Sequence, residues 1–364
     1  MPLYDLNALG WTAELADAFA PHAAEGLIPA RVAAQHRGRL VLYTEDGDVD
    51  AEPSGRLRHT STASDYPAVG DWVAVRTETG GGQALIEAVL PRKSVFVRSD
   101  ADLTRLNTVA GAVVLAANLD LVLVVTAAFQ DLNIRRLERY LAAAWDSGAQ
   151  PVVILTKTDL VEDAPELVRL IEAAAPRTPV LAVSNLTGEG LEQVRALILP
   201  GQTVALLGSS GVGKSSLVNG LLGRARQAVS DVRADGRGRH TTTHRELILL
   251  EDGGLVLDTP GMRLFSPADD AGLEAAFADI ETLARACRFT DCTHRKEPGC
   301  AVQAAVQAGV LEPDRLSGWE KLRRELSFVE RKDDKGAQSE QSKRWRGIHK
   351  AARAWGKQKR SGLD

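Results

Sequence analysis

The chain reads Gly208-Ser209-Ser210-Gly211-Val212-Gly213-Lys214-Ser215-Ser216 directly after an apolar run, Val204–Leu207, and overlapping the start of a predicted helix, Ser215–Leu222. This strand, loop and helix setting is the one that the phosphate-binding pattern G-x-x-x-x-G-K-[ST] requires. Glycines let backbone N–H groups face the phosphates, and the helix N-terminus adds its dipole. Lys214 reaches the β and γ oxygens, and Ser215 supplies an oxygen to Mg²⁺. The alternative, a glycine-rich turn that binds nothing, does not account for this setting.

Around this loop, apolar runs of strand length alternate with amphipathic helical patterns. The predicted strands are Leu121–Thr126, Pro151–Leu155, Val180–Val183 and Val204–Leu207, and the predicted helices include Ile134–Trp145, Pro165–Ala175 and Leu191–Ile198. A later pair of strands, Glu246–Leu250 and Leu255–Asp258, is joined by a hairpin signal at residues 252–254. The alternation predicts an α/β domain whose largely parallel sheet is covered on both faces.

Two segments downstream of the phosphate loop have the character of nucleotide-sensing switches. Asp258-Thr259-Pro260-Gly261 follows a hydrophobic strand, which places Asp258 beside Mg²⁺ and the Gly261 N–H near the γ-phosphate. Before it lies a polar loop that contains His240 and three hydroxyls of the kind that cap Mg²⁺, Thr241, Thr242 and Thr243. D-x-x-G also arises by chance and a threonine run can simply begin a strand. The spacing after the phosphate loop favours switches.

A candidate base-reading loop lies upstream of the phosphate loop, which is the reverse of the usual order. Thr156-Lys157-Thr158-Asp159 ends a hydrophobic strand. Asp159 would accept hydrogen bonds from the guanine N1–H and 2-amino groups, and the Lys157 stem would lie on the base. Adenine lacks that donor pair and would leave a carboxylate unpaired. T-K-x-D alone is a weak signal. Val183-Ser184-Asn185, after the next strand, is where a further base-contacting loop would sit, with Ser184 as its contact.

The N-terminal third predicts a small β domain. After a short helix over residues 12–24, residues 31–51 and 66–97 alternate apolar and polar positions between turn signals, which suits a five-stranded barrel of the OB type. Basic residues accumulate in this part of the chain, and the alternative is that they are ordinary solvated strand residues: Arg31, His36, Arg37, Arg39, Arg56, Arg58, His59, Arg92, Lys93 and Arg98.

The three cysteines lie close together with a histidine, in the pattern Cys287-x4-Cys292-x-His294-x5-Cys300. Three thiolates and one imidazole fill a tetrahedral zinc site and leave no open position, so we expect a structural ion. A redox or hydrolytic centre is the alternative. The surrounding pattern is helical, and a small helical lobe would gain much of its stability from the metal.

Charge is distributed unevenly. Residues 331–364 carry 11 Lys and Arg against 4 Asp and Glu. Because the whole chain has a net charge of −4, residues 1–330 have a net charge of −11. The tail contains Trp345 and Trp355 among its cations, which is typical of a segment that binds RNA, although a solubilising tail has the same composition. The N-terminal stretch has no signal-peptide pattern and no run is long enough to span a membrane, so we expect a cytoplasmic protein without a membrane partner.

Taken together, these motifs closely resemble the small-ribosomal-subunit-dependent GTPase A family of bacterial circularly permuted GTPases. The resemblance runs from about Arg31 to about Val329 and includes His36-Arg37-Gly38-Arg39, the turn and strand Tyr66–Val73, Leu137-Glu138-Arg139-Tyr140-Leu141, the permuted order and the cysteine cluster. It implies four parts: an N-terminal extension and RNA-binding OB-fold over residues 1–100, a permuted GTPase domain over 101–270, a helical zinc domain over 271–330 and a basic tail over 331–364.

The resemblance also implies a monomer that binds the small (30S) ribosomal subunit and its 16S rRNA, and that hydrolyses GTP to GDP and phosphate, with Mg²⁺, late in subunit maturation. One alternative is a non-catalytic RNA-binding assembly factor that uses GTP as an occupancy signal, and another is a transport or signalling GTPase. Two positions depart from the usual GTPase pattern. Thr156 has no carboxamide to bridge to the phosphate loop, and Met262 stands where many GTPases have a water-orienting Gln. His240 could position the water instead, and the alternative is that His240 simply contacts RNA.

Overall fold

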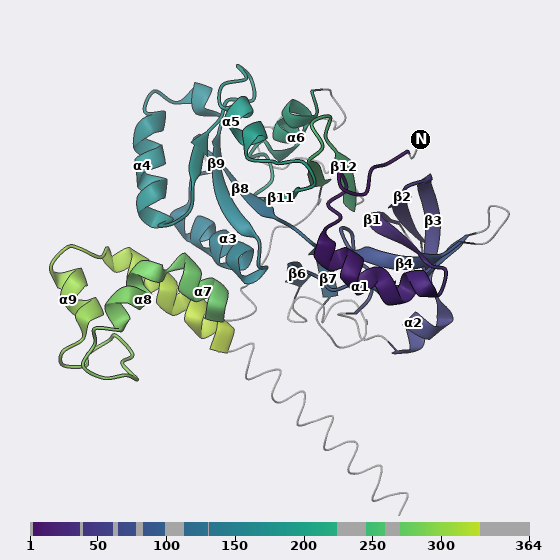
Figure 1. Ribbon diagram of the computed structural model, residues 1–364. Coiled ribbons are helices and arrows are strands. Elements are labelled where there is room, and N and C mark those ends of the chain that lie inside the picture. Colours follow the sequence, from purple (N-terminus) through teal and green to yellow (C-terminus); the bar gives the residue numbers. More distant parts are fainter. Residues whose placement is uncertain are drawn as a thin grey trace, which may run out of the picture.

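The computed structural model describes residues 3–36, 39–60, 65–77, 83–98, 113–129, 131–223, 245–258 and 270–327. Figure 1 shows a β-barrel in purple and blue, an α/β part in teal and a helical lobe in green and yellow. The α/β part contacts the other two, through paired strands on the barrel side and packed helices on the lobe side. Within these described ranges, no helix is long and apolar enough to cross a membrane.

The N-terminal part is the five-stranded barrel that the alternating sequence predicts. Its strands pair in the order β1-β2-β3-β5-β4, and antiparallel pairing of β4 with β1 closes the barrel. Helix α1 (Ala13–Ala24) begins at Thr12, whose hydroxyl accepts a hydrogen bond from the Leu15 N–H. The barrel elements are β1 (Ile28–His36), β2 (Arg39–Thr44), β3 (Gly47–Pro53), α2 (Gly55–Thr60), β4 (Trp72–Arg76) and β5 (Ala84–Val89).

The α/β part has the parallel sheet that the sequence predicts, in the order β10-β9-β8-β11-β13, with antiparallel β12 after β13. Alternate residues of the fully buried β8 enter two separate cores, because successive side chains of a strand point to opposite faces. Helices α3 and α4 cover one face, and α5 and α6 cover the other. The strands are β8 (Leu121–Ala127), β9 (Gln150–Thr156), β10 (Val180–Ala182), β11 (Thr203–Leu207), β12 (Arg245–Leu249) and β13 (Leu255–Asp258), and the helices are α3 (Ile134–Asp146), α4 (Ala164–Ala174), α5 (Leu191–Ala196) and α6 (Lys214–Leu222).

The barrel and the α/β sheet share backbone hydrogen bonds. The end of β1 pairs antiparallel with β12, with Ala34 opposite Glu246 and Gln35 opposite Arg245. The strands of both parts therefore form one continuous hydrogen-bonded order (Figure 1). A separate ribbon of β6 (Val95–Arg98) and β7 (Val113–Ala117) pairs across the boundary proposed at residue 100.

Two of the basic residues that the sequence places in the barrel have structural roles there. Arg31 is only 1% exposed. Its guanidinium donates to the Gly70 carbonyl, to the Thr203 hydroxyl at 2.7 Å and to the carbonyl of Leu9, so it joins the barrel to the first residue of β11. Burial lowers the pKa of Arg31 to about 10, which leaves it charged at neutral pH. Arg92 pairs with a buried carboxylate, Asp71, at 2.7 Å. A buried charge needs such partners, and the sequence alone does not show them.

The helical lobe packs on α3 through α7 (Asp270–Ala276). It continues through α8 (Ala278–Ala284), α9 (Ala301–Gln307) and a helix over 313–327. Arg315 connects the lobe to the α/β part: it donates to Glu138 of α3 at 3.0 Å and to the Ala174 carbonyl at the end of α4. Within the lobe, Arg315 also pairs with Asp279 at 2.7 Å.

Candidate nucleotide site and metal cluster

Five strand ends meet at one edge of the sheet and supply the loops of the candidate nucleotide site. Because β8, β9, β10, β11 and β13 are parallel, their carboxyl ends lie side by side. Ligands of open α/β sheets bind at this edge. The phosphate loop follows β11, the T-K-x-D segment follows β9, Ser184 and Asn185 follow β10, and Asp258 ends β13.

The phosphate loop is shaped by its glycines. At Gly208 the backbone φ is +150°, and a Cβ there would lie 2.3 Å from the Val125 carbonyl oxygen of β8, so a side chain does not fit. Gly213, with φ +97°, begins α6. Lys214 Nζ donates to the carbonyls of Gly208 at 2.8 Å and Ser209 at 2.5 Å, which places the ammonium group within the curl of the loop. A cation and a helix N-terminus together favour a phosphate group.

The T-K-x-D segment forms a tight turn beside the phosphate loop. Lys157 has a left-handed backbone, with φ +58°, and the one-turn 3₁₀-helix η2 (Thr158–Leu160) follows. The buried Ser184 donates its hydroxyl hydrogen to Asp159 Oδ1 at 2.6 Å and accepts from the Thr187 N–H. Ser184 therefore orients the carboxylate that would face the base. The tertiary structure brings this upstream segment next to the phosphate loop despite the permuted order.

Thr156 bridges to the phosphate loop although it has no carboxamide. Thr156 is fully buried, and its hydroxyl donates to the Val212 carbonyl at 2.5 Å. The Nδ2 of Asn185 donates to the next carbonyl of the loop, that of Gly213, at 3.4 Å. A hydroxyl suffices at Thr156 because β9 ends close to the loop, and the carboxamide comes from the neighbouring strand instead.

The acidic residue of the D-x-x-G segment lies at the same edge. Burial raises the pKa of Asp258 to about 6, with a further upward contribution from Glu246, its partner across β12 and β13, and a downward one from Lys214. Asp131, after β8, is a partly buried carboxylate that sequence reasoning missed; burial raises its pKa, while Arg136 and Lys214 oppose the shift. Only the neighbourhood of β8 and β11 in the sheet brings Asp131 toward the loop.

The remaining candidate residues of the two switch segments lie outside the described residues. They are His240, Thr241, Thr242, Thr243, Gly261 and Met262. The basic tail over 331–364 is outside them as well.

In the lobe, the three cysteines and the histidine converge as their spacing predicts. Their ligand atoms all lie within 4.8 Å of one another. His294 Nδ1 is 3.6 Å from Cys287 Sγ and 3.5 Å from Cys300 Sγ, and the two sulfurs are 3.9 Å apart. Donors about 2.1–2.3 Å from a single ion in a tetrahedron lie roughly 3.6–3.8 Å apart, so the set fits one metal ion. Burial lowers the pKa of His294, which favours the neutral imidazole that a metal requires.

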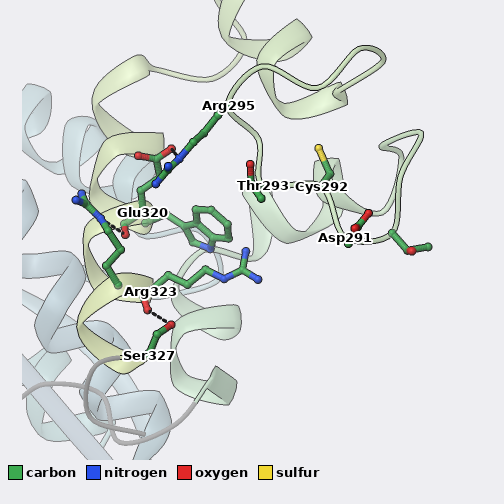
Figure 2. Close-up of a pocket in the computed structure, with 10 residues that line it drawn as sticks. Asp291, Cys292, Thr293, Arg295, Glu320, Arg323 and Ser327 are labelled. Atoms are coloured by element: carbon green, nitrogen blue, oxygen red, sulfur yellow. Dashed lines mark hydrogen bonds and ion pairs between the residues drawn. The ribbon is translucent and has the colours of Figure 1, made fainter. Parts of the chain in front are cut away.

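A pocket of about 450 Å³ opens beside this cluster at Cys292 (Figure 2). Its wall includes Arg295, Glu320 and Arg323, and the Arg323 guanidinium lies over the ring of the buried Trp319 at 4.8 Å. The pocket carries both signs of charge. Among the described residues, the metal cluster brings together four donors, three sulfurs and one imidazole nitrogen, which is the number that a tetrahedral structural site uses.

A phosphate loop after β11, an acidic residue at the end of β13 and a T-K-x-D segment after β9, upstream of the phosphate loop, define a P-loop GTPase with circularly permuted motif order. A family model described as RsgA GTPase matches residues 89–267. The chain belongs to this family, and it is a GTP hydrolase.

Relatives and solved structures agree with this assignment. The chain is 44% identical to the small ribosomal subunit biogenesis GTPase RsgA of Opitutus terrae, over 96% of this chain and 97% of that one. The RsgA protein of Streptomyces coelicolor is also 44% identical, over 98% and 96%. The crystal structure of YjeQ from Thermotoga maritima matches with a TM-score of 0.62 and 27% identity, over 82% of this chain and 98% of that one. The structure of YloQ, described as a circularly permuted GTPase, matches in fold with a TM-score of 0.60, 23% identity and coverage of 83% and 96%.

Proposed function

We propose that this protein hydrolyses GTP to GDP and phosphate while bound to the small ribosomal subunit, during late maturation of that subunit. The relatives named above are small ribosomal subunit biogenesis GTPases of nearly the same length. One observation supports the choice of GTP as the substrate. The phosphate loop lies together with Asp159 and Ser184, which come from two other strand ends. The protein acts in the cytoplasm, as a monomer whose partner in the subunit is 16S rRNA.

Each candidate residue has a role in this proposal. Residues 208–216 hold the phosphates. Asp159 reads guanine, with Lys157 and Thr158 beside it and Ser184 behind it. Bound Mg²⁺ would neutralise the developing charge on the phosphates, and its ligands would be Ser215, Asp258 and one of Thr241, Thr242 and Thr243. Gly261 would donate to the γ-phosphate, and His240 would position the attacking water.

The flanking parts would bind RNA and support the site. We assign residues 1–100 to an RNA-binding extension and barrel, 101–270 to the GTPase domain, 271–330 to the helical domain and 331–364 to a basic RNA-binding tail. Cys287, Cys292, His294 and Cys300 would hold one structural Zn²⁺ per chain, since three thiolates and an imidazole are a typical donor set for that ion.

The β1–β12 pairing supports a route from the barrel to the nucleotide. Ala34 of the barrel pairs with Glu246, and Glu246 pairs in turn with Asp258. A second contact joins the same strands, because the Tyr43 hydroxyl of β2 donates to the Leu247 carbonyl at 3.0 Å. In the sequence, β12 directly follows His240 and the threonines. RNA that moves the barrel would therefore move the strand that connects the two switches.

GTP turnover with purified ribosomal subunits tests this function. Alone, the protein should hydrolyse GTP slowly, because Met262 cannot orient water. Small subunits at matched concentration should raise turnover more than about tenfold and large subunits should not. Binding should weaken as salt rises, because phosphate contacts release counterions. Lys214→Ala should abolish turnover with or without subunits.

The alternatives give different results in the same assay. A non-catalytic assembly factor would bind small subunits with GTP but release no phosphate. A transport or signalling GTPase would show no RNA affinity. Equal turnover with both subunits, or fast turnover with neither present, would contradict the proposal.

A further inference from the structure

We propose that Asn185 is a positioning residue of the nucleotide site, which shares with Thr156 the task of holding the phosphate loop in its binding shape. This inference rests on the proposed guanine-nucleotide site and extends it to a residue outside the motifs. Asn185 follows β10, whereas the T-K-x-D segment follows β9. The carboxamide that Thr156 lacks would then be supplied from the adjacent strand.

The two hydrogen bonds end on consecutive carbonyls of the phosphate loop. Thr156 Oγ1 donates to the Val212 carbonyl at 2.5 Å, and Asn185 Nδ2 donates to the Gly213 carbonyl at 3.4 Å. A trans peptide points its C=O and N–H in opposite directions. Holding the carbonyl of Val212 fixes the direction of the Gly213 N–H, and holding the carbonyl of Gly213 fixes that of Lys214. These N–H groups lie at the start of α6, where a phosphate binds.

The close approach of Asn185 depends on Gly213. A Cβ at that position would lie 3.1 Å from Asn185 Nδ2 and 3.6 Å from Thr156 Oγ1. The two side chains therefore converge on one point of the loop from two strand ends. The bond from Asn185 is longer than that from Thr156, so we expect it to tighten when a phosphate draws the N–H groups forward.

The oxygen of the Asn185 amide is a second indication that a ligand binds here. Among the residues that the structure describes, its buried Oδ1 has no hydrogen-bond donor. A buried acceptor without a donor destabilises the folded protein, and such atoms need a reason to persist. A water or N–H group that arrives with the nucleotide would satisfy Oδ1. The destabilisation that the unsatisfied Oδ1 causes in the nucleotide-free protein would then be removed when the nucleotide binds.

Nucleotide affinity and stability, measured on the full chain, test this role. Asn185→Ala should weaken GDP and GTP binding alike, by about 3- to 10-fold, as the loss of one hydrogen bond implies. KM for GTP should rise by the same factor with kcat nearly unchanged, because the loop holds substrate and transition state equally. The melting temperature of the nucleotide-free variant should not fall, since an unsatisfied acceptor is removed together with the donor.

Three further variants test whether Asn185 positions the phosphate loop or whether its replacement simply disrupts the folded structure around it. Asn185→Leu keeps a side chain of similar size but removes the Nδ2 donor. It should weaken nucleotide binding by the same factor as Asn185→Ala. The double variant Thr156→Asn with Asn185→Ala returns a carboxamide from β9 and should bind GDP within about twofold of the wild type. Leu186→Ala changes the next residue of the same loop, which is 83% exposed, and should bind as the wild type does.

The outcomes distinguish this inference from the proposed function. Wild-type protein that fails to bind GDP and GTP would overturn the proposed site itself. Wild-type binding together with unchanged affinity in Asn185→Ala, or with no recovery in the double variant, would overturn the role of Asn185 alone. A lower melting temperature without nucleotide would also overturn it, because the residue would then be structural.

Discussion

Asp258 and Glu246 face each other across the β12–β13 ladder, at the edge where the nucleotide loops meet. Burial, together with Glu246, raises the pKa of Asp258 from 3.8 to about 6 in the folded protein. The carboxylate is therefore harder to ionise in the folded than in the unfolded chain. The folded protein binds this proton more tightly than the unfolded chain does. The stabilisation that comes from the protonated carboxyl is therefore fully present below pH 4 and is lost as the pH rises through about 6.

We predict that Asp258→Asn stabilises the nucleotide-free protein at pH 7.5. The gain should be about 1–3 kcal/mol, because the cost of ionising a partly buried carboxyl is removed. At pH 5 the gain should shrink to about half, since the folded carboxyl is then mostly protonated. Urea unfolding at the two pH values measures the difference.

Glu246→Gln is the control for that measurement. It removes the charge that adds to the effect of burial on the pKa of Asp258, so the pH range over which stability falls should move to lower pH while Asp258 stays in place. A gain from Asp258→Asn that is equal at both pH values would mean that the carboxyl does not titrate in this window.

The connection between α8 and α9 carries the candidate metal cluster. Between these helices the chain is arranged so that three sulfurs and the His294 ring converge. Cys300 also begins α9, since its sulfur accepts from the Gln303 N–H. The ion would therefore organise both the loop and the helix that follows it.

Cys292→Ser should remove stoichiometric zinc and loosen residues 287–307, by several kcal/mol, while GDP binding is retained. GDP binding should persist because α6 packs in the core on the other face of the sheet. Elemental analysis measures the zinc content, and amide hydrogen exchange measures the loosening of residues 287–307. Asp291→Asn, next to the ligand and exposed, serves as the control. An active wild-type protein purified without zinc would refute the assignment.

At the scale of the whole molecule, α3 holds the helical lobe against the α/β part. In Leu137-Glu138-Arg139-Tyr140-Leu141 the apolar residues enter the core. The two charged residues each bind the helix over 313–327. Glu138 pairs with Arg315 at 3.0 Å with both side chains buried, and Arg139 pairs with Glu325 at 2.6 Å with both partly exposed. Burial raises the pKa of Glu138, and Arg315 opposes the shift.

These two pairs form a matched comparison. Glu138→Ala should cost about 2–4 kcal/mol, because it leaves Arg315 buried with Asp279 as its one charged partner among the described residues. Arg139→Ala should cost less than about 1 kcal/mol, since its pair is partly solvated. Urea unfolding measures both, and limited proteolysis within 270–327 reports whether the lobe detaches. Equal losses for the two variants would show that burial does not set the strength of this contact.

Local patterns in the sequence were enough for the elements and the motifs. The barrel strands, the alternating strands and helices of the sheet, the loop at 208–216 and the metal cluster were all predicted, and the structure confirms their positions. These features follow from the period of apolar side chains and from short spacings, which any stretch of chain contains in itself. The permuted order of the motifs could also be read from the sequence, because T-K-x-D ends a recognisable strand upstream of the phosphate loop.

Only the tertiary structure decided which distant residues meet. Ala34 pairs with Glu246, Arg31 reaches Thr203, and Thr156 and Asn185 converge on the phosphate loop. No period or spacing encodes these contacts, because each depends on the order in which strands join the sheet and on how the barrel closes. A buried Arg31 and a surface arginine look alike in sequence. They differ only in the partners that the folded chain brings to them, and those partners compensate for the loss of water.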